Sequence, residues 1–278
     1  MENTDLFKYE IILHWSAVFI YIVAAFFFVR GMAFAKEKAF NHGMKLIVAG
    51  LVFHSLALLI RWSYAHHGPY LLKYEVLSSN AWIALAVFLY LFFRHPRLRF
   101  TGVFVVPFAF LIIAAALFSH PGIRRLPPGY QSVWLVAHIL FNKLAVAAFL
   151  IAIALLIIYV LKIKKSGLFF LSRLPDTEMI DEYIYKFTAF GFCFWTVTIV
   201  AGAIWADQSW GRYWGWDPIE IWSLITWLML GGYLHFRIFF GWRGMKGAIL
   251  LMVCYSVSIL TVFFLPFLIT SLHSEYFR

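Results

Sequence analysis

The sequence predicts an all-α integral membrane protein with about eight transmembrane helices. Of the 278 residues, 63% are hydrophobic and only 13% are charged, and the mean hydropathy is +0.83. A soluble domain carries about 25% charged residues, whereas a run of about 20 apolar residues crosses the hydrocarbon core of a bilayer. The apolar runs, such as residues 144–160 and 249–270, lack the two-residue alternation of a β-barrel, so helices are the expected spanning structure.

The apolar runs divide the chain into successive spans separated by polar, charged segments. The predicted spans are residues 9–29, 44–62, 80–93, 101–118, 132–161, 183–205, 219–240 and 247–270. The third span is short and can extend back to Glu75, and residues 162–186 form the longest loop on their side, with some ordered structure. We expect one polytopic membrane domain over residues 1–278, with a tryptophan-rich segment at residues 205–222.

Basic residues set the predicted orientation. The loops after the first, third, fifth and seventh spans hold 15 of the 23 Lys and Arg residues, and the opposite side holds 7. Because cytoplasmic loops carry the excess of basic residues, both termini are expected on the extracytoplasmic side. The net charge of +10 then reflects membrane topology and anionic lipid, and no nucleic-acid partner is expected.

The two cysteines, Cys193 and Cys254, each lie inside an apolar run, and the sequence has no CxxC motif. A disulfide framework, thiol redox chemistry and a zinc site are therefore not expected. The sequence also lacks paired carboxylates, a nucleophile triad and a phosphate-binding loop, so no catalytic residue is assigned.

The most unusual segment is WADQSWGRYWGWDPIEIW, at residues 205–222 between the sixth and seventh spans. One interpretation is an interfacial aromatic belt next to a helix start. In that interpretation Asp217 caps the helix, Pro218 occupies its first turn and Glu220 completes a capping box.

The second interpretation of this segment is a platform for a flat, apolar porphyrin with anionic propionates. Trp210 and Trp214 are four residues apart, so they share one side if the stretch is helical. Arg212 could meet a propionate, and Gly211 and Gly215 would allow the ring to approach closely.

The segment resembles the WWD domain of the haem-handling proteins of cytochrome c maturation, and the CcsA/ResC branch of that family in particular. The resemblance rests on WGRYWGWDPIEIWSLITWLMLGGYLHFR at residues 210–237, which includes Trp216 and Asp217. It covers the fifth to eighth spans well and is weaker over the first four. The family commonly has Lys between the Pro and the Glu, where this sequence has Ile219, so a basic side chain is missing beside the platform.

The resemblance implies two sites for a non-covalent haem b. His138 and His273 match the two external iron ligands, beside Trp210, Trp214, Trp216, Arg212 and Asp217. His138 lies about 9 Å below the outer surface by the helical rise of 1.5 Å per residue. The sequence has no CxxCH motif, so covalent c-type attachment of haem to this chain itself is not expected.

His235, in the motif Tyr-Leu-His-x-Arg, matches the family's intramembrane haem ligand. It lies about 24 Å below the outer surface by the same rise. The resemblance implies that its partner ligand comes from a companion subunit, CcsB/ResB, and His54 is the alternative within the chain. The other interpretation of His54 is a packing residue.

Four further features of the sequence concern buried or loop residues near these sites. His14 is either a packing residue, which we favour, or a third external imidazole, and Lys143 inside the fifth span needs a partner. Glu75 matches a Glu of the family's outer loop that would orient a group at the platform's edge. Residues 66–69 form either a surface turn or a lid.

The predicted function is the transport of haem across the membrane, its presentation and its attachment to apocytochrome c. The chain would act as a subunit of a CcsB/CcsA-type cytochrome c synthase in the bacterial cytoplasmic membrane or a thylakoid, with its tryptophan-rich loop on the outer face. One alternative is a bis-histidine b-type cytochrome subunit for electron transfer. Another is a transporter of a different substrate, in which the tryptophans form only an aromatic belt.

Overall fold

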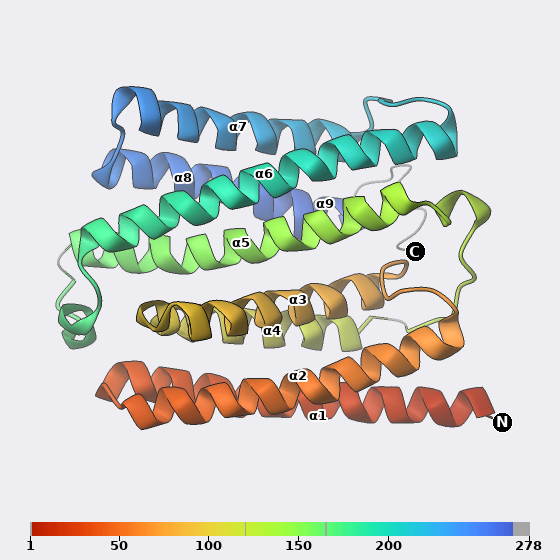
Figure 1. Ribbon diagram of the computed structural model, residues 1–278, viewed down its shortest axis with the longest axis horizontal. Coiled ribbons are helices and arrows are strands. Elements are labelled where there is room, and N and C mark those ends of the chain that lie inside the picture. Colours follow the sequence, from red (N-terminus) through yellow and green to blue (C-terminus); the bar gives the residue numbers. More distant parts are fainter. Residues whose placement is uncertain (1, 120, 165, 269–278) are drawn as a thin grey trace. The chain divides into compact units, whose positions relative to one another are not determined.

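The computed structural model describes residues 2–119, 121–164 and 166–268. Within these ranges the chain is helical and has no β-strand, and eight helices are long and apolar enough to cross a membrane. The predicted all-α class with eight spans is thus confirmed, and the chain is an integral membrane protein. It forms two compact units, Met1–Leu126 with Leu168–Leu174, and Pro127–Gly167 with Pro175–Arg278 (Figure 1). The orientation of the termini and the single-domain organisation stay predictions.

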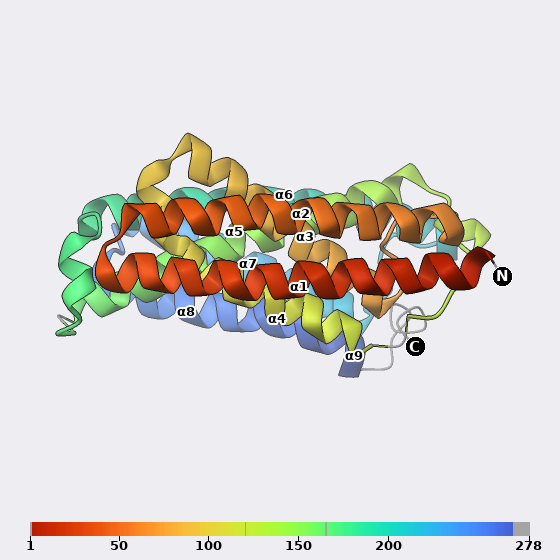
Figure 2. The same cartoon turned by 90° about the horizontal axis from the view of Figure 1, so that it is seen from below.

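The first unit is built from four long helices that reverse direction in turn (Figures 1 and 2). They are α1 (Glu2–Phe34), α2 (Glu37–Ala65), α3 (Lys73–Arg94) and α4 (Gly102–Leu117), with the 3₁₀ helices η1 (Pro96–Thr101) and η3 (Phe169–Arg173). Each long helix contacts the next, and α1 contacts α4, which closes the bundle.

The second unit repeats this order of contacts, although the sequence shows no obvious repeat. Its helices are α5 (Val133–Ile163), α6 (Thr177–Trp210), α7 (Pro218–Phe240) and α8 (Gly244–Ile259), with the 3₁₀ helix η2 (Pro128–Tyr130). Here too each helix contacts the next, and α5 contacts α8. The helix α8 continues through a π-helical turn, η4 (Leu260–Phe264), into α9 (Leu265–Leu268).

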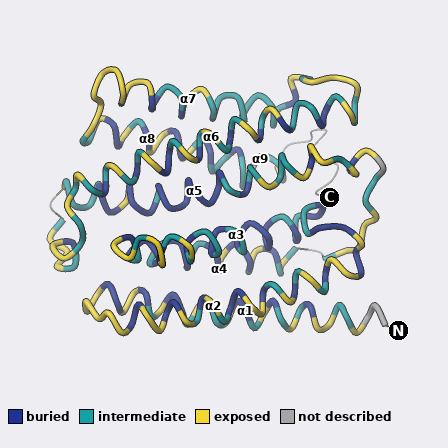
Figure 3. The backbone as a smooth tube through the Cα atoms, in the orientation of Figure 1, coloured by how far each residue is buried: buried dark blue, intermediate teal, exposed yellow. Residues whose placement is uncertain are grey.

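The core of the first unit shows why these sequences pack as helices. Along α1, Ala17, Tyr21, Ala24 and Phe28 are all fully buried and recur at the spacing of one helix face, while the residues between them include exposed ones (Figure 3). Gly50 of α2 faces this stripe, and a Cβ atom there would lie 2.4 Å from the Tyr21 ring. A small residue at this point lets two spans approach closely, which is a common basis of helix packing in membranes.

Helix ends extend beyond the apolar runs because polar side chains cap them. The third span begins at Lys73, before the predicted range, and the Glu75 carboxylate accepts hydrogen bonds from the N–H groups of Leu71 and Leu72. The helix α6 begins after Asp176, whose side chain accepts from the Met179 N–H at 2.7 Å. The predicted loop at residues 162–186 is therefore shorter than expected, and it contains η3.

Candidate functional site

The tryptophan-rich segment joins α6 to α7 in the second unit. The helix α6 ends after Trp210, where Gly211 has a φ of 70° and its N–H donates to the Asp207 carbonyl at 2.8 Å. This left-handed conformation is typical of a glycine that ends a helix. Because the stretch that follows is irregular, Trp210 and Trp214 are not on one helical face. The ring of Trp214 contacts that of Trp216 instead, with centroids 5.9 Å apart.

Trp216 is the most unusual residue of this loop. Its φ of 57° lies in the left-handed region, and its side chain is 69% exposed. A bulky side chain in that region is strained by about 1–3 kcal/mol, and such strain is concentrated at binding and catalytic sites. Tyr213 is also exposed. The loop therefore presents aromatic rings outward rather than packing them into the core.

The predicted helix start at Asp217 is confirmed in detail. Asp217 Oδ1 accepts from the Ile219 N–H at 2.9 Å, and the Glu220 carboxylate accepts from the Asp217 N–H at 3.1 Å, which makes a capping box. Glu220 also accepts from the Gly215 N–H at 2.8 Å. Both carboxylates thus fix the shape of the loop where it enters α7.

The two glycines of the loop have different roles. A Cβ atom at Gly215 would lie 2.7 Å from Cζ of Arg212, so the absence of a side chain lets the guanidinium lie against the loop backbone. A Cβ atom at Gly211 would meet nothing within 4 Å, so its positive φ is what requires glycine there. Arg212 itself is exposed, two positions from both Trp210 and Trp214 in the sequence.

His138, near the start of α5, has a defined protonation pattern. Its Nδ1 lies 2.8 Å from the carbonyl oxygen of Thr198 on α6. A carbonyl can only accept, so Nδ1 carries the proton, and in the neutral ring the lone pair is then on Nε2. A hydrogen bond from one ring nitrogen to a backbone carbonyl is what commonly orients a metal-ligating histidine.

The same imidazole lies at one end of a series of aromatic rings. It stacks on Trp205, with centroids 6.5 Å apart and an interplanar angle of 29°, and Trp205 contacts Trp210 at 4.9 Å and Tyr130 at 5.2 Å. A Cβ atom at Gly202 would lie 2.6 Å from His138 Nδ1, so only glycine leaves room for the ring in this position. The structure thus brings His138 next to the tryptophan-rich segment.

His235 has the opposite surroundings. Its side chain is exposed on α7, its ring lies 4.6 Å from that of Phe239, and no hydrogen bond to it is formed within the described part of the chain. Two residues further on, Arg237 makes two hydrogen bonds to the Asp181 carboxylate, at 3.0 and 2.7 Å. This ion pair holds α7 against α6, and His235 faces away from the core of its unit.

The remaining histidine predictions have different outcomes. His273 lies outside the described residues. His54 is fully buried, with Nε2 2.9 Å from Ser78 Oγ and Nδ1 3.4 Å from the Tyr21 hydroxyl. An iron ligand needs a ring nitrogen that is not already engaged, so this arrangement favours the packing interpretation of His54 over its role as a haem ligand. His14 is likewise buried and hydrogen-bonded.

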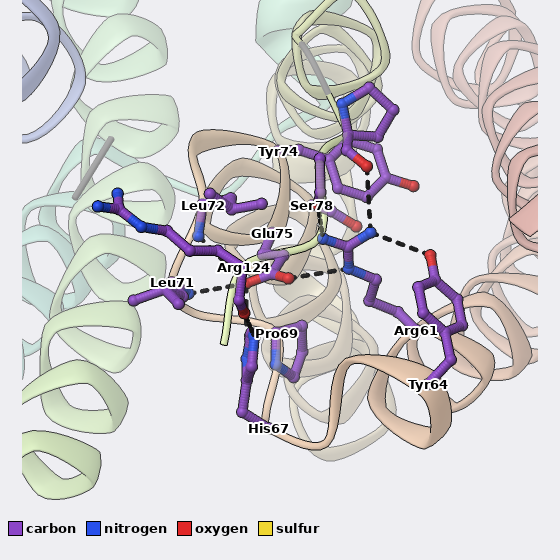
Figure 4. A network of polar contacts seen from close by, with 12 residues as sticks. Arg61, Tyr64, His67, Pro69, Leu71, Leu72, Tyr74, Glu75, Ser78 and Arg124 are labelled. Carbon is purple, nitrogen blue, oxygen red and sulfur yellow. Dashed lines mark hydrogen bonds and ion pairs between the residues drawn. The ribbon is translucent and has the colours of Figure 1, made fainter. Parts of the chain in front are cut away.

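Sequence reasoning missed a buried polar network in the first unit (Figure 4). Arg61 lies at the end of the second predicted span, residues 44–62, where it is fully buried, and its Nε donates to Glu75 at 2.8 Å. Tyr64 receives a hydrogen bond from Arg61 at 3.0 Å and donates its own proton to Glu10. Charged residues in otherwise apolar spans were the available signal, since such residues are costly and usually functional.

Glu75 and the 66–69 segment belong to this network as well. The Glu75 carboxylate both pairs with Arg61 and caps α3, so it is fully engaged within the first unit. His67 is buried, with one ring nitrogen 2.8 Å from the Gly68 carbonyl and the other 3.0 Å from that of Arg124. Burial, and secondly the Glu75 carboxylate, raise the pKa of Tyr70.

The described fold is shared with a known class of membrane proteins. The chain superimposes on Cytochrome c Heme Lyase CcmF with a TM-score of 0.67, covering 95% of this chain and 47% of that one. The chain therefore spans about half the length of that protein. At 15% identity the likeness is one of fold.

Sequence comparison gives the family. The chain is 31% identical to the cytochrome c biogenesis protein CcsA of Synechococcus sp. (strain JA-3-3Ab), over 99% of this chain and 97% of that protein. It is 32% identical to CcsA of Welwitschia mirabilis, over 78% and 81% of the two chains. The pattern that defines the cytochrome C assembly protein family matches residues 70–273. The chain belongs to this family and, within it, to the CcsA proteins, as its tryptophan-rich motif predicted.

Replacing Asp217 by Ala should loosen the first turn of α7. Loss of an N-cap acceptor costs about 1 kcal/mol, which corresponds to a roughly fivefold faster exchange of the Ile219 amide hydrogen. Hydrogen exchange of the purified protein measures this directly. Asp217→Ser keeps an acceptor oxygen and should retain most of the protection, whereas equal protection in wild type and Asp217→Ala would contradict the cap.

Proposed function

We propose that this chain binds haem b non-covalently and presents it at the extracytoplasmic face for attachment to apocytochrome c. It would act as a subunit of a cytochrome c synthase with a CcsB/ResB-type partner. Membership of the CcsA family supports a role in cytochrome c biogenesis. The observation that carries the proposal is the His138 imidazole, held by the Thr198 carbonyl in the tautomer that an iron ligand needs.

In the proposed outer site, His138 Nε2 and His273 would be the two ligands of the haem iron. The buried ring of Trp205 stacks on His138 and contacts Trp210, and the rings of Trp214 and Trp216 contact each other in the loop. A porphyrin is flat and apolar, so exposed indole faces suit it better than aliphatic side chains.

The polar residues of the loop have separate roles in this proposal. The exposed Arg212 guanidinium pairs with a haem propionate, as charge-assisted hydrogen bonds to carboxylates favour. Asp217 acts as a positioning residue, because its carboxylate is engaged with the backbone at the start of α7. Ile219, at the position where the family commonly has Lys, adds no cation.

Two imidazole ligands would hold the haem iron while the haem is presented. In this position the vinyl groups would meet the cysteine thiols of an apocytochrome CxxCH motif. The chain itself has no such motif, so haem leaves it when the thioether bonds form.

A second haem position would lie within the membrane at His235. The imidazole points outward from α7 among Phe236, Phe239 and Phe240. It is therefore accessible to a haem whose other iron ligand belongs to a second chain. We assign its partner ligand to the CcsB/ResB-type subunit. Haem would then pass from His235 to the outer site.

The proposed location is the bacterial cytoplasmic membrane, with the tryptophan-rich loop on the outer face, or a thylakoid. The distribution of basic residues supports this orientation. Relatives from cyanobacteria and from plants and algae are consistent with either membrane.

The alternative function is a bis-histidine b-type cytochrome subunit that keeps its haem and transfers electrons. In that function His138 and His273 would ligate the iron of the retained haem. The exposed Trp216 and Tyr213 favour presentation, since an electron-transfer subunit has no need for aromatic rings that face outward in a strained loop.

Replacing His138 or His273 by Ala should abolish maturation of a reporter cytochrome c co-expressed with the partner subunit. Added imidazole should restore part of the yield, because it can ligate the iron in place of the missing side chain. His42→Ala, which removes an exposed histidine of α2, is the matched control and should mature the reporter normally. A normal yield from the double replacement would rule out the outer site.

His235→Ala should lower the haem that co-purifies with the complex. Loss of groups that merely orient a ligand weakens metal binding by about 10–100-fold. Loss of the ligand itself should therefore lower the affinity for haem at least about tenfold. The Soret absorbance per chain measures the bound haem. Unchanged haem content in a folded His235→Ala complex would exclude the intramembrane assignment while leaving the outer site intact.

A further inference from the structure

Two turns of the first unit carry a high density of basic residues. They are the turn between α1 and α2, within residues 30–45, and the turn between α3 and α4, at residues 94–99. Together these two segments hold seven Lys and Arg residues and one acidic residue, Glu37. Because the helices reverse direction in turn, both turns lie at the same end of the four-helix bundle (Figure 1).

An ion pair brings the two turns side by side. Arg99 of η1 pairs with Glu37, the first residue of α2. Glu37 stands between Lys36 and Lys38 in the sequence, and Arg97 precedes Arg99 by two positions. The cations of both turns therefore belong to one surface of the first unit.

The remaining basic residues of these turns have no acidic partner, since Glu37 is already paired with Arg99. All six are exposed, and in the part of the chain that the structure describes none of their side chains makes an ion pair or a hydrogen bond. We call these six residues the basic patch: Arg30, Lys36, Lys38, Lys45, Arg94 and Arg97.

The rule that sets membrane orientation does not by itself account for the basic patch. Residues 162–186 and 237–246, which flank helices of the second unit, hold eight basic but also four acidic residues. Two of those basic residues are paired, Arg237 with Asp181 at 2.7 Å and Lys186 with Glu182 at 2.5 Å. The orientation rule explains an excess of basic residues in both sets, but it does not require the near absence of acidic residues in the first.

Exposed aromatic rings adjoin the basic patch. Phe34, the last residue of α1, is 67% exposed and precedes Lys36 by two positions. Phe93, next to Arg94 at the end of α3, is 66% exposed. Cations beside exposed apolar rings suit a ligand that has both an anionic group and an apolar part, whereas a free phosphate would make no use of the rings.

We propose that the basic patch is a discrete binding site for an anionic phospholipid. The lipid phosphate pairs with Lys36, Lys38 and Arg97, and its acyl chains lie against Phe34 and Phe93. Clusters of about four to eight basic residues next to a spanning helix are typical of anionic-lipid binding, and the patch has six. The proposal does not rest on the proposed haem function, because no residue of the patch is a proposed haem ligand.

Native mass spectrometry of the purified full chain tests the site by comparing phosphatidylglycerol with phosphatidylcholine of the same acyl chains. Wild type should bind phosphatidylglycerol at least about tenfold more tightly. Each basic residue near an anionic surface strengthens binding about fivefold, so Lys36→Gln/Lys38→Gln/Arg97→Gln should lower the affinity for phosphatidylglycerol by about 100-fold. The affinity of this variant for phosphatidylcholine should not change.

The matched control removes the same charge elsewhere. Lys164→Gln/Arg243→Gln/Lys246→Gln replaces three exposed basic residues of the second unit and should bind phosphatidylglycerol as wild type does. An equal loss of affinity in both triple variants would show only a general attraction to net charge and would overturn the site. Wild-type affinity in the triple variant of the basic patch would overturn it as well.

The apolar part of the ligand is tested separately with glycerol phosphate, which carries the phosphate but no acyl chains. At the concentration of phosphatidylglycerol that saturates wild type, glycerol phosphate should leave the lipid bound. Phe34→Ala/Phe93→Ala should lower the affinity for the lipid about tenfold, because two apolar contacts are lost. Phe118→Ala, which removes an exposed ring just after α4, is the control and should bind normally. Displacement of the lipid by glycerol phosphate, or wild-type affinity in Phe34→Ala/Phe93→Ala, would contradict a lipid ligand.

Discussion

The hydrocarbon interior of a membrane offers no hydrogen-bond partner, so a polar group within a span needs one from the protein or from a bound group. An unpartnered polar group there costs several kcal/mol. This constraint explains why His138 bonds to a backbone carbonyl, and why Arg61 is surrounded by oxygen atoms. This constraint also determines which atom of a side chain carries the proton, because a carbonyl or carboxylate oxygen can only accept a hydrogen bond. The role proposed for His138 follows from its fixed protonation pattern.

In the second unit the same constraint links helix packing to the site. The imidazole of His138 reaches the Thr198 carbonyl only because Gly202 leaves room between α5 and α6. Trp205 donates its indole N–H to the Gly129 carbonyl at 3.1 Å, which anchors the ring on which His138 stacks. Beyond Gly211 the loop is held by Asp217 and Glu220 rather than by apolar packing. Trp216 is thereby left exposed.

Apolar periodicity and local motifs predicted much of this structure. The order of the eight spans and the capping box at Asp217 depend on residues close in sequence, so both could be predicted from the sequence. The Thr198 partner of His138 was not, because any backbone carbonyl can accept and the two residues are 60 positions apart. The true ends of α6 were missed because Asp176 and Gly211, rather than hydrophobicity, set them. The left-handed conformation of Trp216 has no sequence signal, since strain of this kind is imposed by the surrounding loop.

The haem content of Gly202→Ala tests most directly whether His138 in its observed position is an iron ligand. A Cβ atom 2.6 Å from Nδ1 would displace the imidazole and break its bond to Thr198, while the extra methyl group itself favours the helix. The Soret absorbance of Gly202→Ala should therefore fall toward that of a His138→Ala complex. Gly232→Ala, whose Cβ would meet nothing within 4 Å, should keep the wild-type value. Full haem occupancy in a folded Gly202→Ala complex would contradict the assignment of His138.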